Sequence, residues 1–237
     1  MSKVFAIIPN AGTGSRFSNT TPKQYYPIIG KPVIEWTLQT IALHPHIDNT
    51  IVVTAAQDSY EYHSIQQKTP NLRIIKLGGE TRAETVRKGL NYLMENFSTN
   101  SEDLIMIHDA ARCCLHPTSI NLLIEQFAID KYLGAILAAP ITDSIKYGSK
   151  NDLYVSIDHI VLRDNLYTAQ TPQLFLLHSL KEKLINPNFS TDHTDEASLF
   201  NEPDQIQIII NHKPNPKLTS MTDLPYIEYL LNAKTLI

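Results

Sequence analysis

The chain has 237 residues, of which 43% are hydrophobic and 19% are charged, a balance typical of a folded globular protein. Its 20 Lys and Arg residues against 24 Asp and Glu residues give a formal net charge of −4. No basic field therefore covers the molecule, which argues against general binding of nucleic acid or of a membrane surface and leaves anionic small molecules possible only at a local cluster of positive groups.

Apolar runs and helical patterns alternate along residues 3–140. The runs that predict strands each end at a proline, a glycine or a polar residue: Lys3–Ile8, Thr50–Thr54, Leu72–Leu77, Asp103–His108 and Gly134–Ala139. Apolar residues at helical spacing predict the helices Val33–Leu43, Asp58–Lys68 with Asp58 as N-cap, a helix after Gly79 with Ala83, Val86, Leu90 and Leu93 on one face, and Thr118–Asp130 with Thr118 as N-cap. We expect a long loop over Asn10–Gly30. The alternation predicts an α/β fold with a doubly wound, mainly parallel sheet.

The pattern changes at about residues 142–171. Short strands are expected there over Ser144–Tyr147, Leu153–Asp158 and His159–Tyr167, with turns at 148–152 and between Asp158 and His159. We interpret this segment as a β-hairpin arm inserted in a single domain of residues 1–237. The remaining elements are expected to be a helix, a short helix, a strand and a helix: Leu176–Ile185, Asp195–Phe200, Gln205–Ile210 and Asp223–Ala233.

The cysteines and the apolar runs indicate the compartment. Cys113 and Cys114 are adjacent, so a structural disulfide between them would close no useful loop. The run Val4–Ile8 ends at Pro9, too short for a signal peptide, and no run approaches the ~20 apolar residues of a membrane helix. We therefore expect a cytoplasmic protein with neither a membrane nor a nucleic acid as partner.

A glycine-rich turn, P-N-A-G-T-G-S-R, follows the first strand at Pro9–Arg16. Such a turn suggests backbone amides that cradle a phosphate, although a purely structural turn is an equal alternative. The dinucleotide fingerprint fails because Phe17 stands at its third glycine, and the P-loop pattern fails as well. Arg16 and Lys23 bracket the loop. They add the fixed positive charge that phosphoryl or nucleotidyl transfer needs, unless both are plain surface cations.

Two more polar segments follow later strands, and the carboxyl ends of parallel strands meet at one edge of a sheet, where ligands bind. In G-G-E-T-R-A-E-T-V, Glu80 and Thr85 have the chemistry to read a base edge or a ribose, with helix capping as the alternative. In H-D-A-A-R, Asp109 is a candidate Mg²⁺ ligand and Arg112 a phosphate ligand. The spacing of the nearby His and Cys residues disfavours a zinc site. Near the end of the chain, T-D-E-A-S by itself indicates helix capping. Lys217 follows two prolines that could direct its ammonium group, or it is simply an exposed lysine.

Taken together, these motifs resemble the 2-C-methyl-D-erythritol 4-phosphate cytidylyltransferase family over about residues 5–224. The motifs occur in order: P-N-A-G-T-G-S-R, P-K-Q-Y, G-G-E-T-R-A-E-T-V, H-D-A-A-R, A-A-P-I-T-D-S-I-K, T-P-Q, T-D-E-A-S and P-K-L-T. The resemblance implies a Rossmann-like nucleotidyltransferase that joins CTP to 2-C-methyl-D-erythritol 4-phosphate in the non-mevalonate isoprenoid precursor pathway. The products would be pyrophosphate and 4-diphosphocytidyl-2-C-methyl-D-erythritol. A phosphate oxygen would attack the α-phosphorus of CTP in line, with Mg²⁺ present and no general base, because a phosphate monoester with a second pKa of about 6 is already ionised.

The same resemblance implies roles for individual residues. The catalytic cations would be Arg16, Lys23 and Lys217. The CTP pocket would fall on Asn10, Ala11, Gly12, Gly14, Gly79, Glu80, Arg82, Thr85 and Ala110. The polyol-phosphate site would fall on Asp109, Arg112, Ser144, Arg163, Thr171 and Thr194, with Asp109 also holding the metal. The arm at about residues 142–171 is similar to the family's dimerisation arm, which implies a homodimer in which Arg163 and Thr171 reach the partner's active site.

The same residues include a departure from the family pattern and bear on three rival functions. Asn10 stands where the family usually has alanine, and its amide either adds a contact to the base or only fills space. A ribitol 5-phosphate cytidylyltransferase shares the CTP machinery but more often has L-A-G-G in the first loop. An inactive nucleotide-binding module is expected to have lost Arg16, Lys23 or Asp109. A nicotinamide dehydrogenase is disfavoured by Phe17.

Overall fold

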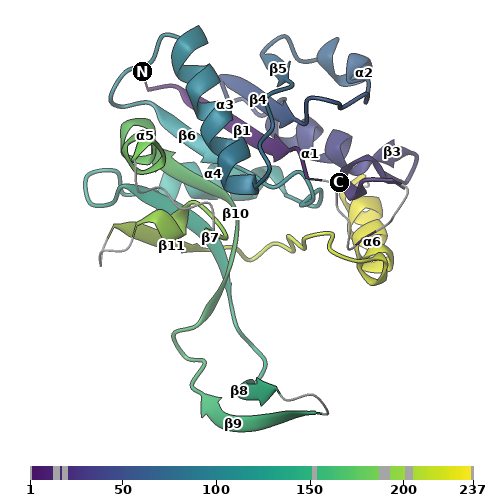
Figure 1. The fold of residues 1–237 in the computed structure, drawn as a ribbon, viewed down its shortest axis with the longest axis vertical. Helices are drawn as coiled ribbons and strands as arrows, with labels where there is room; N and C mark the ends of the chain where they lie inside the picture. Colours follow the sequence, from purple (N-terminus) through teal and green to yellow (C-terminus); the bar gives the residue numbers. More distant parts are fainter. Residues whose placement is uncertain are drawn as a thin grey trace.

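The structure is a computed structural model that describes residues 2–12, 17, 21–150, 154–186, 193–200 and 205–235. Its main strands, in chain order, are β1 (Val4–Asn10), β4 (Asn49–Thr54), β5 (Leu72–Ile75), β6 (Leu104–Ile107), β7 (Gly134–Pro140), β10 (Tyr167–Leu176) and β11 (Ile206–Ile210). They form one sheet in the order β11-β7-β10-β6-β1-β4-β5 (Figure 1). Only β10 runs antiparallel to its neighbours; the other neighbouring pairs are parallel. The predicted α/β fold with a mainly parallel sheet is confirmed.

Helices connect and cover these strands. The α-helices are α1 (Val33–Ile41), α2 (His63–Gln66), α3 (Arg82–Asn96), α4 (Pro117–Gln126), α5 (Leu177–Ile185) and α6 (Leu224–Thr235). Three 3₁₀ turns are η1 (Lys23–Tyr25), η2 (Ala197–Leu199) and η3 (Met221–Asp223). Two small ladders pair β2 (Pro27–Ile28) with β3 (Lys31–Pro32) and β8 (Ile145–Lys150) with β9 (Val155–Val161). No helix in the described part of the chain combines the length and apolarity needed to cross a membrane.

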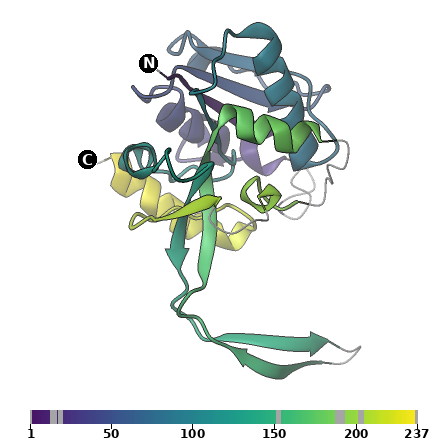
Figure 2. The same ribbon diagram turned by 90° about the vertical axis from the view of Figure 1, so that its left-hand side faces the viewer.

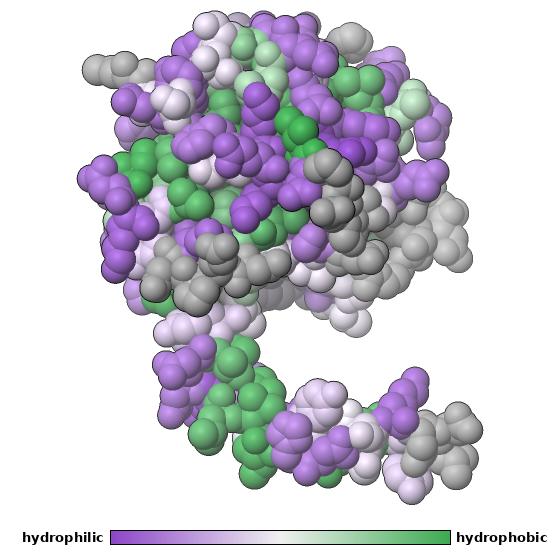
Figure 3. All heavy atoms as spheres, turned by 60° about the vertical axis from the view of Figure 1, so that its left-hand side comes forward, coloured by the Kyte–Doolittle hydropathy of each residue, from purple (hydrophilic) through white to green (hydrophobic). Residues whose placement is uncertain are grey.

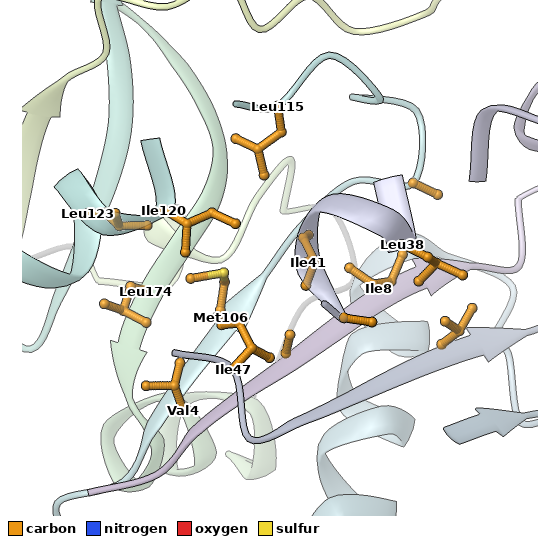
Figure 4. Packing of buried hydrophobic residues seen from close by; sticks show 14 of the residues in the cluster. Val4, Ile8, Leu38, Ile41, Ile47, Met106, Leu115, Ile120, Leu123 and Leu174 are labelled. Carbon is orange, nitrogen blue, oxygen red and sulfur yellow. The ribbon is translucent and has the colours of Figure 1, made fainter. Parts of the chain in front are cut away.

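Strand β1 shows why the sheet is buried on both faces. Val4 and Ile8 lie in the cluster that contains α1 and α4, whereas Phe5 and Ile7 lie in the cluster that contains α3 and α5. Figure 4 shows the first cluster, where Leu38 of α1 faces Ile8. Because alternate residues of a strand point to opposite faces, a parallel strand covered on both sides has a continuous apolar sequence. The run that predicts the first strand is therefore also the centre of the core.

The segments before and after the early helices correct three local predictions. The helix predicted over Asp58–Lys68 is shorter in the structure, where α2 covers only His63–Gln66. Asp58 is not the N-cap of this helix, because its carboxylate accepts from the backbone N–H of Tyr60 (3.1 Å) and from the hydroxyl of Tyr25 (2.7 Å). The cap of α4 is His116 rather than Thr118, since the His116 ring accepts from the Thr118 amide. The loop predicted over Asn10–Gly30 contains η1 and β2.

The arm leaves the sheet between β7 and β10 and bends to one side (Figures 1 and 2). Its two strands, β8 and β9, pair antiparallel over most of their length. The turn predicted between Asp158 and His159 was wrong, because β9 continues through both residues and the His159 ring stacks on Tyr147 at 4.8 Å. Two adjacent polar residues suggested a turn between strands, but an exposed strand accommodates polar residues on either face. The residues at 151–153 lie outside the described part.

Candidate functional site

A cleft of about 990 Å³ lies at the carboxyl ends of β1, β4, β5 and β6. Its walls come from the residues that follow each strand, including Ala11 after β1, Ala55 after β4, Gly78 after β5 and Asp109 after β6. The turn after β1 and the turn after β5 touch: a Cβ on Gly78 would lie 2.4 Å from the Cβ of Ala11. Only glycine fits at position 78 for this reason. The edge of the sheet predicted to bind a ligand is therefore hollow.

The cleft gathers most of the residues predicted to bind CTP or to act as catalytic cations. Those that line it are Asn10, Ala11, Gly12, Gly79, Glu80, Arg82, Thr85, Ala110, Lys23 and Lys217, together with Asp109. The predicted residues Gly14 and Arg16 lie outside the described part of the chain. Segments more than 200 residues apart in the sequence thus meet in one hollow, and their individual roles stay predictions.

Asp109 is the electrostatic centre of the cleft. Its Oδ1 accepts from Nε of Arg82 at 2.9 Å, its Oδ2 lies 2.7 Å from Nζ of Lys217, and Nε of Arg112 is 3.9 Å away. Burial alone would raise the pKa of Asp109, but the charges of Arg82, Lys217 and Arg112 hold it well below its usual range. One ionised carboxylate therefore keeps three cations together that would otherwise repel one another.

Glu196 is a member of this charged network that sequence reasoning missed. It lies just before η2, is 2% exposed, and its Oε1 accepts from Nη1 of Arg82 at 2.6 Å. Burial raises the pKa of Glu196, and the neighbouring Arg82 opposes that rise. The signal was present in T-D-E-A-S, but the motif by itself indicated capping. Thr194, the predicted substrate residue of that motif, is exposed and does not line the cleft.

Thr171 supports Asp109 from within the same chain. Its Oγ1 accepts the backbone N–H of Asp109 at 3.0 Å and lies 3.1 Å from Nδ1 of His108, whose Nε2 is 3.2 Å from the carbonyl oxygen of Arg112. A consistent assignment has Thr171 donating to Nδ1 and Nε2–H donating to Arg112. Thr171 is 4% exposed. The prediction that it reaches a partner's site was therefore wrong, because the side chain is enclosed by its own fold.

The other predicted substrate residues divide between the cleft rim and the arm. Arg112 is next to Asp109 and donates from Nη1 to the carbonyl oxygen of Asn215 at 2.7 Å. Ser144 and Arg163 lie at the root of the arm, are exposed, and do not line the cleft. Nη1 of Arg163 donates to the carbonyl oxygen of Thr142. One chain alone thus does not bring these two side chains to the cleft.

The turns at the start of α3 are built by hydrogen bonds to Thr81 and Thr85. Thr81 is the N-cap of α3 and accepts from the backbone N–H of Glu84 at 3.1 Å. Thr85 Oγ1 accepts from the N–H of Gly79 at 3.1 Å and donates to the carbonyl oxygen of Thr81 at 2.8 Å. The capping alternative drawn from the sequence is confirmed for this segment, through Thr81, and its role in reading a ligand stays a prediction. The amide of Glu80 is engaged as well, since it donates to Oε2 of Glu84 at 2.9 Å.

The contacts of Asp109 do not fit a metal ion at this residue. Each of its carboxylate oxygens already has a cation within 2.9 Å, and nowhere among the described residues do three His, Cys, Asp or Glu side chains gather. Mg²⁺ needs oxygen ligands at short distance and is commonly held by one or two carboxylates plus substrate phosphates. The same finding offers no support for zinc at His108, Cys113, Cys114 and His116, and both cysteines pack in the apolar cluster beneath α6.

Comparison with known proteins gives a consistent result along the whole chain. The family model for 2-C-methyl-D-erythritol 4-phosphate cytidylyltransferase matches residues 4–233. A protein of that name from Neisseria gonorrhoeae (strain NCCP11945) is 39% identical over 232 residues, covering 98% of each chain. Another from Azoarcus sp. (strain BH72) is 36% identical over 233 residues, covering 98% of this chain and 95% of the relative.

Solved structures of the same kind share the fold. The crystal structure of a 4-diphosphocytidyl-2C-methyl-D-erythritol synthase, 36% identical in sequence, superposes with a TM-score of 0.81 and covers 98% of this chain and 100% of its own. The Francisella tularensis 2-C-methyl-D-erythritol 4-phosphate cytidylyltransferase, 31% identical, gives a TM-score of 0.77 over 97% of this chain and 100% of its own.

Proposed function

Because the chain belongs to the 2-C-methyl-D-erythritol 4-phosphate cytidylyltransferase family, we propose that its reaction takes place in the cleft around Asp109. The protein is a nucleotidyltransferase that joins CTP to 2-C-methyl-D-erythritol 4-phosphate in isoprenoid precursor synthesis, with pyrophosphate as the second product. The observation that carries the assignment of the cleft is the convergence of Lys23, Lys217, Arg82 and Arg112 beside a glycine-rich turn.

The triphosphate of CTP is the group that this cleft suits best. Backbone amides of the turn at Ala11 and Gly12 are the proposed donors for phosphate oxygens, because the amides of Gly79 and Glu80 already donate to Thr85 and Glu84. Lys23 and Lys217, which also line the cleft, add positive charge, and Arg16 is proposed to join them. The amides hold the nucleotide in place, while the cations stabilise the charge that develops on the α-phosphoryl group in the transition state.

The polyol phosphate is proposed to lie on the Asp109 side of the cleft. Arg112 would pair with its phosphate, and Asp109 would accept from a hydroxyl of the polyol once anionic substrates compete for Arg82 and Lys217. The attacking phosphate oxygen is already ionised near neutral pH, so alignment of two anions is the main task and no base is assigned. We retain Thr194, two residues from Glu196, as a weaker candidate for the same site.

We also propose a homodimer formed through the arm. The exposed side chains of the arm include six large apolar ones: Tyr147, Tyr154, Val155, Ile157, Ile160 and Leu162. Figure 3 shows apolar surface along the arm, away from the body of the molecule. Such a contiguous apolar surface is typical of an interaction site. In the proposed dimer, Ser144 and Arg163 at the arm's root would complete the polyol-phosphate site of the second copy, which their exposed position in one chain permits.

Mg²⁺ is proposed to accompany the triphosphate rather than to be held by Asp109. A divalent ion bound to the phosphates would neutralise part of their charge, and no step above depends on a protein ligand for it. A cytoplasmic location, expected from the sequence, also remains our proposal.

A substrate matrix tests the proposed function. Pyrophosphate release is measured with CTP or UTP against 2-C-methyl-D-erythritol 4-phosphate or ribitol 5-phosphate, with Mg²⁺ present and with Mg²⁺ chelated. We expect turnover with CTP and the methylerythritol phosphate, loss of turnover on chelation, and much slower turnover with ribitol 5-phosphate. Preferred turnover of ribitol 5-phosphate, or none with any pair, would contradict the assignment.

A further inference from the structure

The three consecutive side chains of η1 have hydrogen-bond partners in three different parts of the fold. Nζ of Lys23 donates to the carbonyl oxygen of Leu218 at 3.1 Å, next to Lys217 in the chain. Nε2 of Gln24 donates to the carbonyl oxygen of Gly12 at 2.8 Å, in the glycine-rich turn. The hydroxyl of Tyr25 has other partners, in Asn10, Tyr62 and Asp58. A single 3₁₀ turn has few hydrogen bonds of its own, so these side chains fix where Lys23 stands.

Tyr25 belongs to a partly buried network with Asn10, Tyr62 and Asp58. Nδ2 of Asn10 lies 2.9 Å from the hydroxyl of Tyr25 and 2.9 Å from that of Tyr62. The two hydroxyls are 3.1 Å apart, and the hydroxyl of Tyr25 lies 2.7 Å from Oδ2 of Asp58. The network therefore joins the last residue of β1 to η1 and to the segment before α2.

Asp58 sets the direction of these hydrogen bonds. An ionised carboxylate can only accept, so Tyr25 donates its one hydrogen to Asp58. Burial raises the pKa of Tyr25 and of Tyr62, which keeps both hydroxyls protonated. The two phenolic oxygens then accept the two N–H groups of the Asn10 amide. This assignment orients the amide, since its opposite flip would leave both N–H groups buried without acceptors.

We propose that Asn10 is a positioning residue that acts on the reaction through Tyr25 and Lys23 and does not contact the base. Asn10 is 4% exposed although its backbone borders the cleft, and both of its donors are engaged by tyrosines. Its side chain has no donor left for a nucleobase, and its Oδ1 is buried without a hydrogen-bond partner among the described residues. The proposed role therefore differs from both roles that the sequence left open for Asn10, a base contact and simple space-filling. The inference rests on the proposed role of Lys23.

The test is a double-mutant cycle between Asn10→Ala and Lys23→Ala, read as kcat, KM for CTP and preference for CTP over UTP. We expect Asn10→Ala to lower kcat about tenfold, as the loss of two neutral hydrogen bonds allows, while KM and the CTP preference stay within about twofold. In the Lys23→Ala background the same change should cost almost nothing, because the group through which Asn10 acts is gone.

Two further variants provide a substitute for Asn10→Ala and a control. Tyr62→Phe removes one acceptor of the Asn10 amide with a small change in volume, and it should reproduce part of the kcat loss if Asn10→Ala does not fold. Tyr60→Phe is the matched control. The Tyr60 ring stacks on Tyr25, but its hydroxyl donates to Glu35 at 2.7 Å, outside the network. We expect Tyr60→Phe to keep kcat.

Each of the other possible results would contradict one part of the proposal. An unchanged kcat in Asn10→Ala, or a kcat loss that multiplies fully with that of Lys23→Ala, would show that Asn10 does not act through Lys23. An altered CTP preference would show a base contact instead. Full turnover by Lys23→Ala would remove Lys23 from the proposed function, and the inference with it.

Discussion

The cleft and the arm distribute their side chains in opposite ways. In the cleft, charged side chains are buried: Glu196 is 2% exposed and Asp109 is 7% exposed, and each is paired with Arg82. In the arm, apolar side chains are exposed, with Leu162 at 83% and Val155 at 67%. Buried charges that are paired indicate a charge network completed within one chain, whereas exposed apolar residues indicate a surface that another chain covers. The contrast predicts that mutations in the cleft act within one chain and mutations in the arm act between chains.

The largest expected effect tests whether the charge network around Asp109 stabilises the folded chain. Asp109→Asn removes the carboxylate shared by three cations and should lower the free energy of unfolding by ~3–5 kcal/mol, the usual cost of breaking a buried ion pair. Urea denaturation at pH 7 measures it. Asp164→Asn in the exposed arm is the control and should change stability little. Equal stability of Asp109→Asn and wild type would mean that the network contributes nothing.

The same pair of proteins should converge in acid. The pKa of Asp109 is lowered in the folded state, so its contribution to stability is present above the unfolded pKa and is lost as pH falls towards the folded pKa. The difference in unfolding free energy between wild type and Asp109→Asn should therefore shrink as pH falls below about 4. A difference that grows below this pH would contradict the assigned pairing.

The next effect concerns catalysis in the cleft. Lys23→Ala should fold normally and lose about 10²–10³ in kcat, equivalent to ~2.7–4 kcal/mol of transition-state stabilisation. Steady-state pyrophosphate release measures the loss. Lys31→Ala is the control, because Lys31 lies 4.5 Å over the ring of Trp36 and does not line the cleft. Native turnover in Lys23→Ala would exclude that side chain from the reaction.

A smaller effect tests whether the arm acts between chains. Arg163→Ala and Lys23→Ala should each be nearly inactive alone, but equal amounts mixed by unfolding and refolding should recover about a quarter of wild-type activity. Half of the dimers would then be mixed, and each would hold one complete site. A mixture no more active than its components would contradict exchange of Arg163 between subunits.

How far sequence reasoning reached also differs between the two regions. The sheet and the position of the cleft followed from strand periodicity and from the rule that ligands bind at strand ends. Most of the lining, including Arg82 and Lys217, was predicted only from the resemblance of the motifs to the family. Glu196 was not predicted, because its role depends on its ion pair with Arg82, which lies 114 residues earlier in the chain. The arm was harder to predict locally, since an exposed strand such as β9 has no buried face to impose alternation.

The smallest expected effect lies outside both regions and calibrates the stability measurements. The turn between β2 and β3 places Ile29 at φ 50° and Gly30 at φ 72°. A β-branched residue is unfavourable at positive φ, and asparagine tolerates it better. Ile29→Asn should raise the free energy of unfolding by about 1 kcal/mol, measured by urea denaturation. Ile28→Asn, at a fully buried neighbour, should instead lower it.

Strand β10 joins the two regions, and its pairing with β7 shifts register between Ala169 and Gln173. The strand leaves the arm at Tyr167. Its last residues, up to Leu176, pair with β6, which ends just before Asp109. Because successive side chains of a strand alternate sides, one residue added within β10 would rotate Thr171 away from the amide it supports. Lineages that lengthen or shorten this appendage should therefore do so at its far end, near Lys150 and Val155, and keep its attachment constant in length.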